Sequence, residues 1–142
     1  MAIKSDKGPG ALARSDRGAS AVEFALVAPL FLLILLGILA YGGYFWRAHA
    51  LQQVANDAAR AAIAGLTAPE RASIARATVQ SEIGRLGGIE PARAAVTVSE
   101  EEDAILVTLA YDARQDVFFQ LPLVPMPAPV ISRIAAVRLG GF

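Results

Sequence analysis

The sequence predicts an α+β fold in which a long N-terminal transmembrane helix continues into a helical stem. A small domain with one helix and a three-stranded antiparallel sheet follows. The prediction depends on three observations. The run from Phe24 to Trp46 has no charged residue, and residues 47–64 are rich in alanine without a helix breaker. Beyond residue 94 the apolar residues alternate, as in strands, instead of recurring at helical spacing.

The composition argues against several classes of function. The chain of 142 residues has a formal net charge of zero, so no basic surface points to nucleic acid as a partner. Cysteine is absent and His49 is the only histidine, which argues against a thiolate nucleophile and a Cys/His metal site. The sequence has no phosphate-binding loop, dinucleotide motif or metal-ligand spacing. We therefore expect no enzyme: no catalytic residue, no cofactor, no metal and no small-molecule substrate.

Residues 1–18 are interpreted as a cytoplasmic leader that is cleaved off. Residues 1–17 are small and polar, contain glycine and proline, and carry a local excess of positive charge just before the apolar run. Such a composition predicts disorder. The positive-inside rule places this end of the chain in the cytoplasm and the C-terminal domain outside.

Residues 19–46 are predicted to form a single transmembrane helix. About 23 uncharged residues at about 1.5 Å each span roughly 35 Å, which exceeds the ~30 Å hydrocarbon core of a bilayer. Aromatic residues at the end of the run are expected to form an interfacial belt: Tyr41, Tyr44, Phe45 and Trp46. Small residues that would permit close helix approach are Gly37, Gly42 and Gly43.

Hydropathy leaves three interpretations of this segment open. A secretory signal could be cut after Ala50, which would release a secreted domain, although the apolar core is long for a signal peptide. A plain signal anchor would leave an uncleaved, membrane-anchored extracytoplasmic interaction module. The third interpretation has a cut between Gly18 and Ala19, which makes Glu23 the fifth residue of the mature chain.

A cut at this position would give the carboxylate of Glu23 a partner. A charged carboxylate near the end of a membrane helix is unfavourable unless it snorkels to the interface or finds a partner. After the cut, Ala19 carries a new ammonium group about 6 Å along the helix from Glu23. The carboxylate of one subunit could then pair with the amine of a staggered neighbour, where a low dielectric strengthens the attraction.

The sequence Gly18-Ala19-Ser20-Ala21-Val22-Glu23-Phe24 resembles the cleavage site of type IV prepilins. Its continuation to Pro29 and the leucine-rich run resemble the TadE-like family of minor pseudopilins from the tight-adherence (Tad/Flp) pilus system. The resemblance implies a single-pass protein of the bacterial inner membrane that supports pilus biogenesis and adherence. It implies processing by prepilin peptidase at Gly18 and Ala19. Assembly with other pseudopilins or pilus assembly proteins would then use Glu23, Phe24 and Pro29, the proline giving a kink suited to helix packing.

The helix is expected to continue as a stem over residues 47–65, ending at Gly65. An apolar stripe at helical spacing is expected to pack on the C-terminal domain: Leu51, Val54, Ala55, Ala58 and Ala62.

The small extracytoplasmic domain is assigned to residues 66–142. A second helix is predicted from Pro69 to Leu86, capped by Thr67 and stopped by Gly87-Gly88. Its apolar face is Ala72, Ala75, Val79, Ile83 and Leu86, and its arginines, Arg71, Arg76 and Arg85, are interpreted as a solvated face.

Strands are predicted at 94–99, 105–111 and 131–139, the first two joined by a solvated acidic turn at 100–103. The proline-containing segment 112–130 is predicted to be an extended connection. Its Phe118-Phe119 pair would either close the edge of the core or contact a partner subunit.

Overall fold

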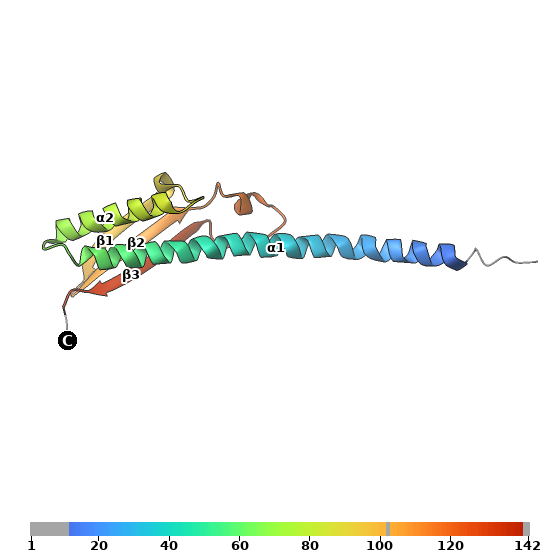
Figure 1. Ribbon diagram of the computed structural model, residues 1–142, viewed down its shortest axis with the longest axis horizontal. Coiled ribbons are helices and arrows are strands. Elements are labelled where there is room, and N and C mark those ends of the chain that lie inside the picture. The colour runs from blue at the N-terminus through green and yellow to red at the C-terminus, as the bar shows by residue number, and fades with distance from the viewer. Residues whose placement is uncertain (1–11, 102, 141–142) are drawn as a thin grey trace, which may run out of the picture. The chain divides into compact units, whose positions relative to one another are not determined.

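The structure is a computed structural model that describes residues 12–101 and 103–140, with side chains from Gly18 onward. Its helices are α1 (Leu12–Ala62) and α2 (Ala68–Arg85), with short 3-10 helices η1 (Pro91–Arg93) and η2 (Val117–Gln120). Its strands are β1 (Ala94–Glu101), β2 (Ala104–Asp112) and β3 (Val130–Arg138). This arrangement confirms the predicted α+β class (Figure 1). Contacts divide the chain into two units, residues 1–38 and 39–142, which are described separately.

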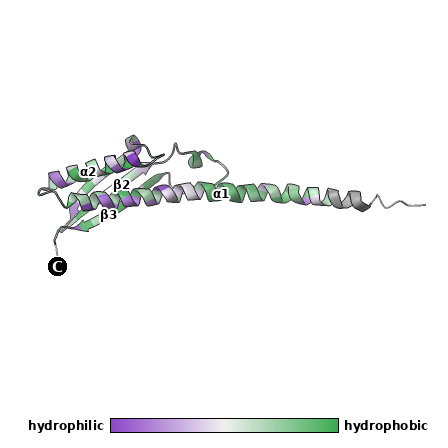
Figure 2. Cartoon of the chain, viewed as in Figure 1, coloured by the Kyte–Doolittle hydropathy of each residue, from purple (hydrophilic) through white to green (hydrophobic). Residues whose placement is uncertain are grey.

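Helix α1 carries the apolar run and continues through Pro29. Its hydrophobic stretch is evident in Figure 2. Among the described residues, α1 is the one helix long and apolar enough to cross a membrane, and nothing in its most apolar stretch is buried. Because α1 begins at Leu12, the predicted disorder of the leader is wrong for residues 12–17, while residues 1–11 lie outside the described part. A helix that already exists extends over preceding residues without a new nucleation cost, which accounts for the difference.

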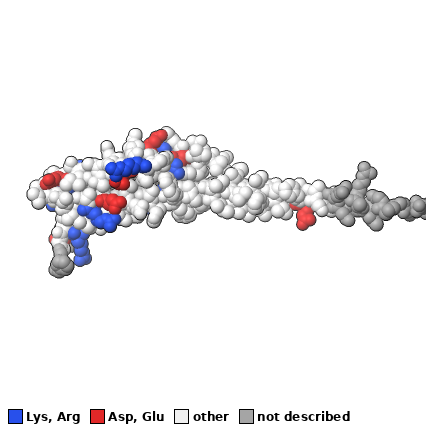
Figure 3. Space-filling model, viewed as in Figure 1, with Lys and Arg blue, Asp and Glu red and all other residues white. Residues whose placement is uncertain are grey.

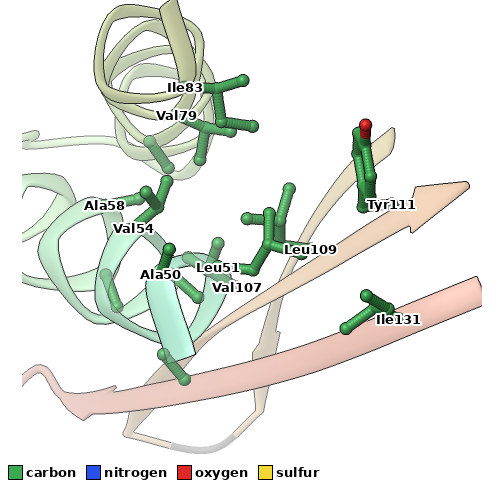
Figure 4. Packing of buried hydrophobic residues seen from close by; sticks show 14 of the residues in the cluster. Ala50, Leu51, Val54, Ala58, Val79, Ile83, Val107, Leu109, Tyr111 and Ile131 are labelled. Carbon is green, nitrogen blue, oxygen red and sulfur yellow. The ribbon is translucent and has the colours of Figure 1, made fainter. Parts of the chain in front are cut away.

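The core of the unit formed by residues 39–142 lies between the two helices and one face of the sheet. All five residues of the predicted apolar stripe on α1 are buried. They form one cluster with Val79 and Ile83 of α2 and the inward side chains of β2. Figure 4 labels Leu51, Val54 and Ala58 of this stripe. The stripe therefore packs within the chain, as predicted.

The sheet is antiparallel, in the order β1-β2-β3. Its central strand β2 alternates between buried and partly buried residues, and Val107 is paired with Val98 on one side and Ala135 on the other. The inward residues of β2 are the four predicted ones, Ile105, Val107, Leu109 and Tyr111. Each predicted strand differs from the observed one by at most two residues at an end.

The start of α2 explains two features of the chain. Thr67 Oγ1 accepts a hydrogen bond from the Glu70 backbone N–H at 3.4 Å, which confirms the predicted cap. Glu70 Oε2 accepts from the Leu66 N–H at 2.9 Å, one residue before the position usual in a capping box. A side chain at Gly65 would lie 2.7 Å from the Arg71 backbone nitrogen, so only glycine permits this approach. After α2, Gly88 adopts a φ of 80°, which favours glycine.

Arg71 is not part of a solvated face. Its Nε and Nη2 atoms bond both carboxylate oxygens of Glu100 at 2.6 and 3.0 Å. This bidentate bond lowers the pKa of Glu100 and raises that of Arg71. The sequence interpretation is therefore wrong for Arg71, because the first turn of α2 lies against the end of β1. The exposed side chains of Arg76 and Arg85 agree with it.

Candidate functional site

The residues singled out in the sequence lie along the exposed N-terminal part of α1. Every residue from Gly18 to Val27 is exposed. The helix places Glu23 one turn after Ala19, on the same side of the helix. Phe24 and Pro29 follow on the same helix and are also exposed. No other part of the described chain therefore covers the backbone, the carboxylate or the apolar side chains of this stretch.

Glu23 is the one charged residue between Gly18 and Trp46. Among the described side chains, none of the ion pairs involves it. A side chain added at Gly18 would meet nothing within 4 Å, so the surroundings of the predicted cut are open. The Glu23 carboxylate therefore has no ion-pair partner among the described side chains. The backbone at Gly18 is accessible.

Pro29 adds an unsatisfied backbone group to the same stretch. Proline has no N–H, so the carbonyl of Ala25 lacks its usual helical donor. In a membrane such a carbonyl is satisfied by neighbouring helices, hydroxyl side chains or water. Both Glu23 and Ala25 thus offer acceptors at the start of a stretch, residues 24–40, whose side chains are apolar.

The described residues outside this stretch contain no group of three or more His, Asp or Glu side chains able to hold a metal ion. A surface depression of about 280 Å³ is lined by Asn56, Ala59, Arg60 and residues 135–137. These groups include neither a nucleophile nor a base paired with one. We therefore assign no chemical role to this depression.

A buried charge cluster lies in the unit formed by residues 39–142, and sequence reasoning missed it. Asp116 is 4% exposed. Its Oδ2 lies 2.8 Å from Arg47 Nε as an ion pair without an aligned hydrogen bond. Its Oδ1 accepts hydrogen bonds from Arg93 Nη1 at 3.0 Å and from the Tyr111 hydroxyl at 3.4 Å. The cluster joins α1, η1, β2 and the connection after β2.

The electrostatics of this cluster favour a structural role. Burial, and then the charge of Asp116, raise the pKa of Tyr111. Burial opposes the charged form of Arg93, but the hydrogen bond to Asp116 and nearby charges outweigh it and raise the pKa of Arg93. The raised pKa values keep the Tyr111 hydroxyl neutral and the Arg93 guanidinium charged. A carboxylate committed to two guanidinium groups is a poor general base, so the cluster holds segments together.

Next to the charge cluster, the connection between β2 and β3 packs on the aromatic end of the apolar run. The Tyr41 hydroxyl donates a hydrogen bond to the Pro125 carbonyl at 2.6 Å. The rings of Tyr44 and Phe119 meet edge to face, with centroids 6.2 Å apart. Part of the predicted aromatic belt therefore makes contacts inside the chain, while Phe45 and Trp46 stay exposed.

Phe118 is buried and fills the space at Gly43, where an added Cβ would lie 3.1 Å from the ring. Gly43 therefore admits a ring of its own chain, which differs from its predicted use in contacts between helices. Gly37 and Gly42 have open space around them. The guanidinium of Arg47 lies 4.6 Å from the centroid of the same Phe118 ring. The sequence leaves two interpretations of the Phe118-Phe119 pair, closure of the edge of the core or contact with a partner subunit. This packing matches closure of the core edge.

One signal in the sequence could have indicated the charge cluster. Arg47 is the first charge after the apolar run, and Asp116 is the last charge before an uncharged stretch that ends at Arg133. Two opposite charges that each border an apolar segment are candidates for pairing when those segments meet.

A comparison with known families matches residues 18–60 to the family described as TadE-like protein. Comparisons with curated proteins and with solved structures gave no significant match. The matched range contains the predicted cleavage site, Glu23, Phe24, Pro29 and most of the stem. TadE-like proteins belong to pilus systems and are structural rather than enzymatic. Residues 18–60 are thus a TadE-like segment, and the resemblance predicted from the sequence is confirmed.

Proposed function

We propose that the protein is a minor pseudopilin of a Tad/Flp-type pilus, anchored in the bacterial inner membrane and assembled through its N-terminal helix. The observation that carries the proposal is the exposed, TadE-like stretch in which Gly18, Glu23 and Pro29 stand on an apolar helix of membrane length. Its function is to support pilus biogenesis and adherence.

In this proposal the N-terminus is cytoplasmic and the domain extracytoplasmic, as the basic residues before the apolar run favour. A prepilin peptidase cuts between Gly18 and Ala19. Water adds across the peptide bond, so the leader leaves with a carboxylate at Gly18 and the mature chain begins with the amine of Ala19. The open space around Gly18 is compatible with access by a peptidase.

The new amine then gives Glu23 a partner on a neighbouring subunit. A carboxylate near the end of a membrane helix is unfavourable without a partner, so pairing is favoured over leaving Glu23 alone. The partners are other pseudopilins or pilus assembly proteins whose helices pack beside α1. Exposed apolar side chains such as Phe24 supply the contacts around the ion pair.

Mass analysis of the full-length protein, co-expressed with a prepilin peptidase and recovered from membranes, tests the proposal. A chain that begins at Ala19 is expected. A chain that keeps residues 1–18 would instead indicate the uncleaved anchored interaction module, and a chain that begins at Leu51 would indicate secretion. Either result contradicts the pseudopilin proposal.

Gly18→Val is expected to block the cut, and Gly37→Val is the matched control. Both glycines lie on α1 with open space around them, so neither substitution creates a clash. Cleavage that persists in Gly18→Val would argue against this site.

Burial within α1 counts against release after Ala50. Ala48, Ala50 and Leu51 are buried in the core. A cut there would divide the helix that fills the domain, and the released chain would lose part of its core packing.

A further inference from the structure

The connection from Val117 to Val130 is an uncharged, apolar segment on the surface of a domain whose other surfaces carry charge. No Asp, Glu, Lys, Arg or His occurs between Asp116 and Arg133. On the face seen in Figure 3, the charged side chains of this unit gather over α2 and the sheet. Val117 is 77% exposed and Leu123 is 67% exposed. Where exposed large apolar side chains form a patch, the patch marks a protein or membrane interaction site.

This connection is fastened to the last turns of the apolar run on α1. The Tyr41 hydroxyl donates a hydrogen bond to the Pro125 carbonyl, and the Phe118 ring packs on Gly43. Figure 1 shows this connection in orange, leading from β2 to β3 beside α1. Tyr41 and Gly43 belong to the predicted membrane helix. Phe118 and Pro125 of the connection therefore lie at the level of the last turns of that helix.

The polar boundaries of the two segments coincide. Arg47 is the first charged residue after the apolar run, and Asp116 is the last one before the uncharged connection. They form an ion pair at 2.8 Å. On both segments the chain therefore changes from charged to apolar at one level, as expected where a protein passes from water into a bilayer interface.

The backbone of the connection also suits this location. Irregular backbone is unfavourable in hydrocarbon because its N–H groups lack partners. Four of the residues in the connection are prolines, at positions 122, 125, 127 and 129, and these have no N–H. The cost of moving the segment out of bulk water is correspondingly lower.

We propose that the segment 117–130 lies in the headgroup–acyl boundary of the same bilayer that α1 spans, with Val117 and Leu123 in contact with lipid. The inference depends on the membrane anchoring in the proposed function, but not on cleavage or pilus assembly. The partner is the phospholipid surface itself, and the segment fixes how deep the domain sits in it.

The experiment uses the full-length protein in phosphatidylcholine–phosphatidylglycerol vesicles. Since the chain has no cysteine, a Leu123→Cys variant offers one site for an environment-sensitive fluorophore. Leu66→Cys is the matched control, because Leu66 is also an exposed leucine, at 88%. It follows the end of α1, roughly 20 Å further along the helix axis than Arg47. Val117→Cys provides a second test position.

Labels at positions 123 and 117 should be quenched by lipids with a shallow doxyl group and protected several-fold from aqueous iodide. The label at position 66 should behave in the opposite way. Equal access of iodide to positions 123 and 66 would overturn the proposal. Protection from iodide without quenching by doxyl lipids would also overturn it, because a protein surface would then cover the segment.

Alkaline carbonate extraction separates this proposal from the proposed function. If carbonate releases the unmodified protein from the vesicles, both membrane anchoring and the interfacial location are wrong. If the protein resists extraction while Leu123 stays in water, only the interfacial location is wrong.

Discussion

Asp116 illustrates how much one buried side chain can organise in a small domain. A carboxylate loses its hydration when it is buried, and it is tolerated when opposite charges and hydrogen bonds replace the lost water. Here Arg47 comes from α1, Arg93 from η1 and Tyr111 from β2, and all three meet at Asp116. Removing the carboxylate would leave two guanidinium groups next to each other in a partly buried position.

Asp116→Asn should therefore lower the free energy of unfolding by about 3 kcal/mol, as expected when one partner of a buried ion pair is removed. Thermal unfolding of the full chain in detergent, followed by near-ultraviolet circular dichroism, measures the change. Asp57→Asn is the control, because Asp57 forms an exposed pair with Arg60 and should cost less than about 0.5 kcal/mol. Equal effects of the two substitutions would show that the Asp116 cluster is not a significant source of stability.

The bond between Glu100 and Arg71 predicts a dependence of stability on acid. The folded state holds the pKa of Glu100 below its ordinary value of 4.5. A carboxyl group with a lowered folded pKa stabilises the fold above its ordinary pKa, and this contribution is lost as the pH falls through the folded value. Stability should hold near neutral pH and fall below about pH 4.5.

Glu100→Gln should flatten this acid dependence while lowering stability at neutral pH. Melting temperatures at neutral and acid pH, compared with those of Glu82→Gln, provide the measurement. Glu82 forms an exposed pair with Arg85, so its variant should keep the slope of the unmodified protein. An unchanged slope in Glu100→Gln would assign the acid sensitivity to other groups.

At the scale of the elements, helices and strands could be predicted from hydrophobic period because their burial is regular. The four inward residues of β2 alternate strictly, and the stripe from Leu51 to Ala62 recurs at helical spacing. Local capping chemistry likewise located the start of α2 at Thr67. These signals lie within a few residues of each other, so no knowledge of tertiary contacts is needed.

Pairings between distant elements could not be predicted in the same way. The contact of Arg71 with Glu100, and that of Arg47 with Asp116, depend on which ends of two elements meet. Composition says only that such residues are charged. The same holds for Gly43, whose small size indicates a close approach but not that Phe118 makes it.

The approach of η2 to α1 can be tested at this glycine. In Gly43→Val the new side chain would overlap Phe118, and overpacking of this kind typically costs about 1–3 kcal/mol. Gly42→Val is the control, since the space around Gly42 is open. Melting temperatures of both variants, alone and combined with Phe118→Ala, measure the contact.

Phe118→Ala should remove the difference between the two valine variants. If Gly43→Val is no less stable than Gly42→Val, then the ring is not held against the helix.

At the scale of the whole molecule, the TadE-like segment carries the residues of the proposed assembly, and its end from Leu51 to Ala59 also packs in the core of the folded domain. The cleavage and pairing residues could be named from the sequence because they lie in one short motif. Their roles stay predictions, because a single chain does not contain the neighbour to which Glu23 would bind.

Glu23→Gln should leave membrane insertion and cleavage intact but reduce incorporation beside partner subunits at least several-fold. A loss of only ~1.4 kcal/mol in pairing already weakens association tenfold. Recovery of the protein in sheared pilus fractions or with co-purified pseudopilins measures assembly. Glu101→Gln, on an exposed strand end, is the control. Unchanged assembly of the Glu23 variant would refute the amine–carboxylate pairing.

The single helix α1 has a mechanical consequence. Its C-terminal half is the central packing element of the folded domain, and its N-terminal half is the apolar segment that the proposal places among other subunits. Force applied along α1 would therefore act directly on the domain core. Leu51, Val54 and their neighbours would have to slide past the sheet together before the helix could be pulled free.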